Sequence, residues 1–157
     1  MADQKVLHAR DTISGQEGRA YATINGNKEE MFYVKKLEAK VEKEKAEIKA
    51  LGRRGTQSKA KGWKGTGSMT IYYITTLFRE MMNEYMVSGK DTYFDITVTN
   101  EDPSSSVGMQ TVIIKNVNLD SVIMASLDTG SDTLEEEISF TFDGIEIKDR
   151  FKAPSTN

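Results

Sequence analysis

Cysteine is absent from the 157 residues, and histidine occurs once, as His8. Without cysteine the chain can form no disulfide and can offer no thiolate as a ligand or nucleophile. A single histidine leaves almost no material for a zinc site or a Ser–His catalytic pair. We therefore predict no catalytic residue, no metal site and no bound cofactor, and we expect that the protein is not an enzyme.

Long apolar runs are also absent. No stretch approaches the roughly 20 apolar residues that span a bilayer, and the N-terminal residues contain no signal-peptide core. We expect a protein without a membrane anchor, kept in a cytoplasm-like space. A nucleotide-binding motif is missing too, because Gly62, Gly65 and Gly67 do not form GxGxxG and no Gly-Lys-Ser/Thr follows them.

Charge is present but unevenly distributed. The net charge is −3, yet residues 49–79 hold seven basic residues and no acidic one. Residues 128–149 hold eight acidic residues against the single base Lys148. The two regions could form two faces of one monomer, or two surfaces that meet between copies.

A long basic loop over Gly52–Gly67 is the most informative prediction. Hairpin turns need two to five residues, and longer loops are usually functional or disordered. We predict that this loop docks onto an acidic surface through Arg53, Arg54, Lys59, Lys61, Trp63 and Lys64. The acidic partners that we predict for it are Glu135, Glu136 and Glu137.

Alternating apolar residues elsewhere favour a mainly β fold. We expect about seven strands in a β-sandwich or barrel, forming one domain over residues 1–157, with an N-terminal arm at 1–11 and a C-terminal tail at 152–157. The expected strands cover residues 19–24, 31–34, 37–51, 68–74, 93–99, 110–117, 119–127, 134–142 and 145–147. The strands at 110–117 and 119–127 adjoin each other. Glu136 interrupts the apolar face of the strand at 134–142, so we expect that end of the strand to be exposed.

One packing helix is expected over residues 76–87. Its apolar stripe comprises Leu77, Phe78, Met81, Met82, Tyr85 and Met86, and we interpret this stripe as core. Thr75 or Thr76 can cap the start of the helix, and Gly89 occupies the position of a left-handed C-terminal cap.

The segment Leu37–Leu51 gives conflicting signals. Its Glu, Lys and Ala residues and the spacing of its apolar residues favour a helix. Read as a strand, Leu37 and Val41 lie on one face and Ala46 and Ile48 on the other, which requires a bulge or bend between Lys43 and Lys45.

Three segments resemble the tail tube protein of contractile phage tails, in its XkdM-like group from PBSX-type prophages. They are TISGQEGRA at 12–20, the run from Lys35 to Thr75, and ASLDTGSDTLEEEISFTFDG at 125–144. Their order and spacing make the match specific, although no single motif is a chemical signature. The resemblance covers residues 12–144, and it implies that residues 37–51 form a long strand.

The resemblance also implies a function. Six copies are expected to form a ring, and stacked rings form a hollow conduit for DNA inside a contractile tail. The implied partners are further copies of the chain and the tail sheath, baseplate and tape-measure proteins. DNA would pass without specific binding, and the protein would reside in the virion tail after assembly in the bacterial cytoplasm.

A conduit for DNA should not hold its cargo, because basic residues in the lumen would neutralise phosphates. Glu38, Glu42 and Glu44 share one strand face, and we predict that this face lines the channel. The alternative function is a monomeric β-barrel that binds nucleic acid, in which Trp63 and Tyr72 or Tyr73 stack on bases beside the basic loop. The net negative charge argues against this alternative.

Overall fold

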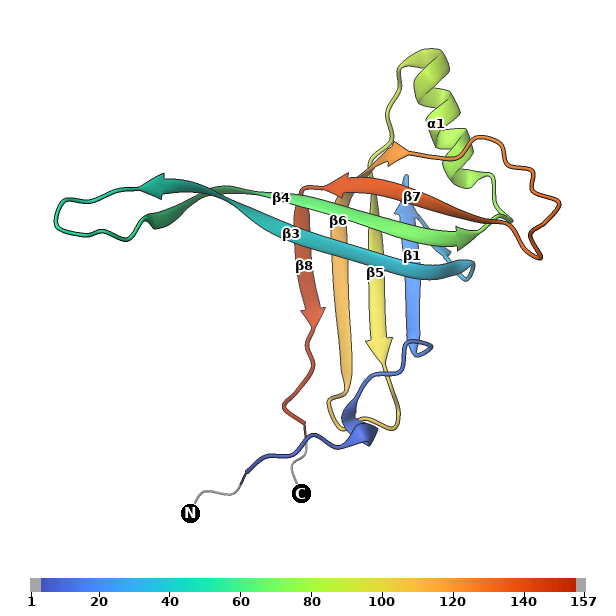
Figure 1. The fold of residues 1–157 in the computed structure, drawn as a ribbon. Helices are drawn as coiled ribbons and strands as arrows, with labels where there is room; N and C mark the ends of the chain where they lie inside the picture. The colour runs from blue at the N-terminus through green and yellow to red at the C-terminus, as the bar shows by residue number, and fades with distance from the viewer. Residues whose placement is uncertain (1–3, 155–157) are drawn as a thin grey trace. The chain divides into compact units, whose positions relative to one another are not determined.

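The computed structural model describes residues 4–154, and its strands confirm a mainly β fold (Figure 1). Eight antiparallel strands are hydrogen-bonded in the order β2-β1-β5-β6-β7-β4-β3, and β8 also pairs with β6. The strands are β1 (Gly18–Ile24), β2 (Asn27–Glu30), β3 (Val34–Ile48), β4 (Gln57–Tyr72), β5 (Phe94–Glu101), β6 (Met109–Ser121), β7 (Glu135–Phe142) and β8 (Gly144–Asp149). This sheet is not closed into a barrel, since β2 and β3 are its two ends.

The chain divides into two compact units where the sequence predicts a single domain. Unit 1 comprises residues 1–32, 93–115 and 145–157, and unit 2 comprises residues 33–92 and 116–144. Strand β6 passes from one unit to the other between Lys115 and Asn116, and Asn116 has a positive φ of 55°. The single-domain organisation remains a prediction.

Unit 1 contains β1, β2, β5, β8 and the first part of β6. Asn25 and Gly26 both have positive φ and form the tight β1–β2 turn that the sequence predicts. Its core includes Ala22, Ile96 and Ile114, each at most 2% exposed.

The N-terminal segment of unit 1 is hydrogen-bonded to the loop that contains Ser106. A short 3-10 helix, η1 (Ala9–Asp11), ends in Asp11, which is buried. Asp11 Oδ1 accepts hydrogen bonds from the backbone N–H (3.0 Å) and the hydroxyl (2.7 Å) of Ser106. These bonds lower the pKa of Asp11. Asp11, at the end of the predicted arm, is therefore bonded to Ser106, while residues 1–3 lie outside the described part of the chain.

At the other end, the Lys152 N–H donates to the carbonyl of Val107 at 2.8 Å. The predicted tail at 152–157 is thus attached at its first residue. Residues 155–157 lie outside the described part of the chain.

Unit 2 contains β3, β4, β7, the end of β6 and the helix α1 (Leu77–Ser88). The prediction of one helix is confirmed within one residue at each end. The Thr75 hydroxyl accepts a bond from the Leu77 N–H (3.3 Å), and Gly89 ends the helix with φ 75°. Only the first half of the apolar stripe is core: Phe78 and Met81 are buried, whereas Tyr85 and Met86 are 51% and 65% exposed.

Strand β3 resolves the conflict over residues 37–51. It is a continuous strand from Val34 to Ile48, paired with β4 along its length. The register shifts between Glu44 and Lys45, where the extra residue is Lys61 on β4. The bulge expected between Lys43 and Lys45 of β3 is therefore on the partner strand, and β3 itself does not change face there. Pairing with β4 overrides the local helix propensity.

Three predictions about strands and loops are wrong. Residues 57–67 of the predicted basic loop belong to β4, so only residues 49–56 connect the two strands. Residues 31–33 are a connection rather than a strand, and Met31 and Tyr33 are apolar because they are buried. Residues 110–121 form one strand instead of two, and residues 122–127 are irregular.

Candidate functional site

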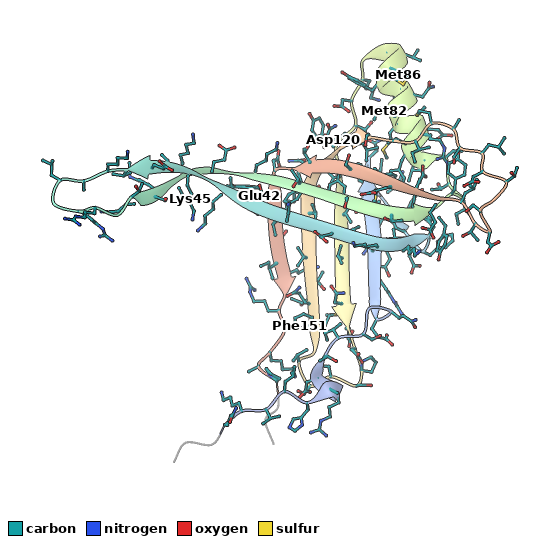
Figure 2. All side chains as sticks on the ribbon, viewed as in Figure 1. Glu42, Lys45, Met82, Met86, Asp120 and Phe151 are labelled. Carbon is teal, nitrogen blue, oxygen red and sulfur yellow. The ribbon has the colours of Figure 1, made fainter. Side chains whose placement is uncertain are left out.

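A two-stranded arm projects from the sheet of unit 2 (Figure 1). Strand β7 pairs with β4 only from Gly65 to Tyr72, so residues 42–64 of β3, β4 and their turn have no third strand beside them. We call residues 42–64 the arm. Every residue in it is exposed except Ala46, which is half-buried. Figure 2 shows its side chains, including Glu42 and Lys45, extending into solvent on both sides.

The base of the arm is fixed by glycines. Gly65 and Gly67 pair with Phe142 and Phe140 on β7, and the two rings occupy the space where Cβ atoms would be. An ideal Cβ on Gly67 would lie 2.4 Å from Phe140 Cζ, and one on Gly65 would lie 2.5 Å from Phe142 Cε2. These glycines, interpreted above as part of a loop, allow aromatic rings to pack flat against a strand.

The predicted docking residues all lie on the arm. Arg53 and Arg54 are in its tip, and Lys59, Lys61 and Lys64 are on β4. The arm carries eight basic and three acidic residues, a net charge of +5. Trp63 is 46% exposed and packs against Phe142, with ring centroids 6.3 Å apart.

The three predicted acidic partners have different environments. Glu135 is paired with Lys35 at 2.8 Å, and this hydrogen bond raises the pKa of Lys35. Glu137 is exposed, and it forms no ion pair or hydrogen bond with the other side chains of residues 4–154. Glu136 is only 2% exposed, so the expected exposed end of the strand is wrong and Glu136 does not suit docking.

Arg79 of α1 explains the burial of Glu136. Its guanidinium donates to Glu136 Oε2 at 2.7 Å, donates to the carbonyl of Thr75, and lies 4.1 Å from the centroid of the Tyr73 ring. The sequence pattern alone did not predict this network. The available signal was an isolated acid on the apolar face of a strand, which requires a buried base as its partner.

The predicted lumen residues lie on one polar face of unit 2. Glu38, Glu42 and Glu44 lie on the face of β3 opposite Leu37 and Ala39, which are half-buried. Their neighbours on this face, by register, are Lys36 and Lys40 on β3, Lys64 on β4, and Glu135 and Glu137 on β7. Lys35 also lies on this face, because it is paired with Glu135, so five acids and four bases give the face a net charge of −1. Lys40 and Glu42 form an exposed ion pair (3.0 Å), and Glu42 raises the pKa of Lys40.

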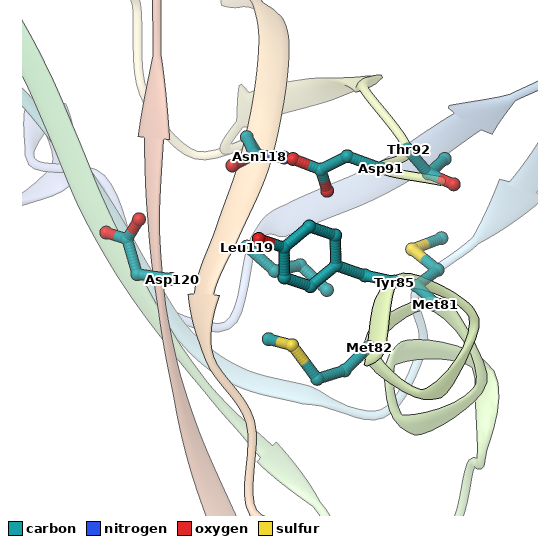
Figure 3. Close-up of a pocket in the computed structure, with 8 residues that line it drawn as sticks. All are labelled: Met81, Met82, Tyr85, Asp91, Thr92, Asn118, Leu119 and Asp120. Atoms are coloured by element: carbon teal, nitrogen blue, oxygen red, sulfur yellow. The ribbon is translucent and has the colours of Figure 1, made fainter. Parts of the chain in front are cut away.

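A cavity of about 200 Å³ lies between α1 and the end of β6 (Figure 3). Met81, Met82 and Tyr85 of α1 and Leu119 of β6 supply its apolar walls, while Asn118, Asp91 and Asp120 add polar groups. The Nδ2 atom of Asn118 is buried and has no hydrogen-bond partner within the described residues. The carboxylates of Asp91 and Asp120 are exposed and form no ion pair there.

Among residues 4–154, no cluster of three or more His, Asp or Glu residues is placed to hold a metal ion. The same residues contain no helix with the length and hydrophobicity of a membrane span. The alternative function requires aromatic side chains that are free to stack on bases. One face of the Tyr73 ring is occupied by Arg79, and Trp63 packs against Phe142, so these two rings are only partly available.

Comparison with known proteins identifies the family. A family model described as phage tail tube protein matches residues 5–149, which include both units. The chain belongs to the phage tail tube family. It is a structural subunit of a tail tube, located in the virion tail, and not an enzyme.

Two proteins of Bacillus subtilis (strain 168) are similar to this tail tube protein. XkdM of the phage-like element PBSX is 42% identical over 144 residues, which cover 92% of this chain and 95% of XkdM. YqbM is 42% identical over 147 residues, which cover 94% of this chain and 97% of YqbM. These matches confirm the resemblance to the XkdM-like group.

Three solved structures are similar to this chain, two of them at low sequence identity. The anti-feeding prophage baseplate matches with a TM-score of 0.63 and 12% identity, over 94% of this chain and 97% of that chain. The SPP1 tail tube matches with a TM-score of 0.62 and 10% identity, over 90% of this chain and 80% of that chain. A Bacillus subtilis protein of known structure is 40% identical, with a TM-score of 0.51, over 90% of this chain and 99% of that chain.

Proposed function

We propose that six copies of this tail tube protein form a ring, that rings stack into a hollow tube within a contractile tail, and that DNA passes through without specific binding. The sheath, baseplate and tape-measure proteins are its further partners. The anti-feeding prophage baseplate was symmetrised six-fold, which supports this ring size.

The observation that carries the proposal is the unpaired arm. A two-stranded hairpin is marginally stable in water, and a long open strand edge invites pairing with another chain. The arm leaves both of its outer edges unpaired within its own subunit, and its side chains are exposed. We infer that a neighbouring subunit or ring covers it, and that Arg53, Arg54, Lys59, Lys61, Trp63 and Lys64 form this contact. Of the acidic residues that we predicted as their partners, Glu135 and Glu137 remain candidates, because both are exposed. The ion pair between Glu135 and Lys35 is itself exposed to solvent.

The polar face of β3, β4 and β7 supplies the channel wall in this proposal. The opposite face of these strands carries Met69 and Ile138, which pack in the core, and Leu37, which is half-buried. The face of Glu38, Glu42 and Glu44 is therefore the one available to a water-filled lumen. Its net charge of −1 is repeated six times in a ring, which disfavours binding of the DNA phosphates to the wall.

Electron microscopy of the purified protein tests the proposal. We expect rings or tubes in negative stain and a size-exclusion profile well above the monomer. The double variant R53E/R54E should remain folded but lose tube growth, since the charge of the tip is reversed. A wild-type protein that stays monomeric in the presence of tail baseplates would contradict the proposal.

A further inference from the structure

We propose that the tip of the arm inserts Leu51 into the cavity between α1 and β6 of a second copy, while Arg53 and Arg54 pair with Asp91 and Asp120 at its rim. This inference rests on the proposed stacking of copies, and it assigns the receptor for the arm. The receptor differs from the Glu135–Glu137 segment that the sequence predicts.

The tip is built to present Leu51. The Arg53 N–H bonds to the carbonyl of Ala50 at 3.4 Å, and Gly52 has φ 80°, as expected for the third position of a type II turn. Leu51 occupies the second position, at the corner, and its exposed fraction is 104%. A fully exposed leucine on an ordered turn, within a strongly charged arm, is a candidate anchor for a partner.

The contact must come from another copy. Strand β3 leaves the three-stranded part of the sheet at Val41. It continues for seven residues to Ile48, so the arm extends about 23 Å beyond the sheet. Within unit 2 the arm runs away from the sheet, on the side opposite α1 (Figure 1). The tip therefore cannot reach the cavity of its own subunit, whereas a neighbouring subunit could present the same cavity to it.

The cavity has the chemistry to receive this tip. Met82, Tyr85 and Leu119 form apolar walls around about 200 Å³, and a cavity of about 150 Å³ can hold a benzene ring. There is thus room for one leucine side chain.

The charges are also complementary. Arg53 and Arg54 form no ion pair within residues 4–154, and Asp91 and Asp120 are likewise unpaired there. The guanidinium groups two and three residues after the leucine could therefore meet the two carboxylates that line the cavity. Guanidinium–carboxylate pairs at the rim fix orientation and register.

Cysteine crosslinking gives a direct test, because the native chain has no cysteine. In assembled tubes, the variant L51C/M82C should oxidise to a ladder of covalent oligomers that a reducing agent collapses to monomer. The matched control L51C/N83C places the second thiol on the next residue of α1, which is exposed and does not line the cavity. Disulfides need Cα atoms within about 7 Å, so the control should give little ladder.

Charge reversal provides an independent test. R53E/R54E should lose tube growth, D91R/D120R should lose it as well, and the four-fold variant that combines them should regain it. Tubes that form without an L51C/M82C crosslink, together with no recovery in the four-fold variant, would overturn this contact but leave the proposed tube intact. Failure of the unmodified protein to assemble would instead count against the proposed function, and against this contact with it.

Discussion

Gly67 shows how a single residue fixes the base of the arm. The glycine lies between β3 and β7, and its missing side chain leaves room for the Phe140 ring and for the backbone carbonyl of Glu38. A Cβ at this position would lie 2.7 Å from that carbonyl oxygen, so the backbone itself would have to move.

We therefore expect Gly67→Ala to destabilise the protein by about 1–3 kcal/mol, the usual cost of overpacking a core. Gly62→Ala is the matched control, because the nearest atom to its Cβ is Glu44 Oε2 at 3.8 Å. The control should change stability by less than about 0.5 kcal/mol. Urea unfolding of the unassembled protein measures the free energy of unfolding of both variants. Equal values for the two variants would show that the contact of Gly67 with the Phe140 side chain is unimportant.

The Arg79–Glu136 pair is the other residue-scale feature with a large expected effect. The two side chains are 11% and 0% exposed, so removal of one partner leaves the other as an uncompensated buried charge. We expect Arg79→Met to cost about 3–5 kcal/mol, and the double variant R79M/E136L to recover part of this loss.

Lys35→Met is the control, because Lys35 and Glu135 form an exposed ion pair with side chains 50% and 35% exposed. Its effect should stay below about 1 kcal/mol. Thermal unfolding compares the three variants, and a double variant less stable than R79M alone would contradict the assignment of a charge-pair penalty.

At the scale of elements, the arm is a hairpin that its own subunit leaves incomplete. β3 and β4 pair over 14 residue pairs, from Val34–Ile71 to Ile48–Gln57, but only the part from Gly65 onward is joined by β7. Alternating Lys and Glu residues on β3 keep this open edge soluble before assembly, as charged edge strands do in other proteins.

Proline within the arm should separate assembly from folding. Ala46→Pro removes a backbone donor and breaks the regular pairing of the strand, at a position remote from the core of unit 2. We expect rings and tubes to be lost, with only a modest decrease of the β signal in circular dichroism. Ser126→Pro, in an irregular segment, should still assemble. Normal tubes from Ala46→Pro would mean that the arm is not part of an interface.

At the scale of the whole molecule, the two faces of β3 have different roles. One face continues the core of unit 2 through Leu37 and Ala39, and the other carries only polar side chains from Lys36 to Glu44. A subunit that packs one face of this strand toward its core and exposes an acidic face to water is suited to form the wall of an aqueous channel.

Accessibility of single cysteines can locate the acidic face. In assembled tubes we expect Glu42→Cys to react with a small maleimide but to be protected from a maleimide on a large polymer, because the polymer cannot enter a narrow lumen. In the unassembled protein both reagents should react. The comparison variant Lys43→Cys points to the opposite face and should lose reactivity toward both reagents on assembly. Equal labelling of Glu42→Cys by the polymer before and after assembly would place this residue outside the lumen.

The sequence by itself determined the mainly β fold, the single helix, the tight turn at Asn25–Gly26 and the family. Each of these rests on local periodicity, turn chemistry or the order of segments. It also located the positive charge in residues 49–79, since charge can be read directly from the residues, and the docking role of this segment stays a prediction.

Only the tertiary structure decided how these segments are used. Gly65 and Gly67 look like loop residues in the sequence, because nothing local indicates that Phe140 and Phe142, more than 70 residues away, lie over them. Glu136 looks exposed until Arg79 is placed beside it. The helix propensity of residues 37–51 is overridden by cross-strand pairing with β4, which is a non-local interaction. Pairing, burial and ring contacts depend on residues distant in sequence, and for that reason the three-dimensional structure was needed to define them.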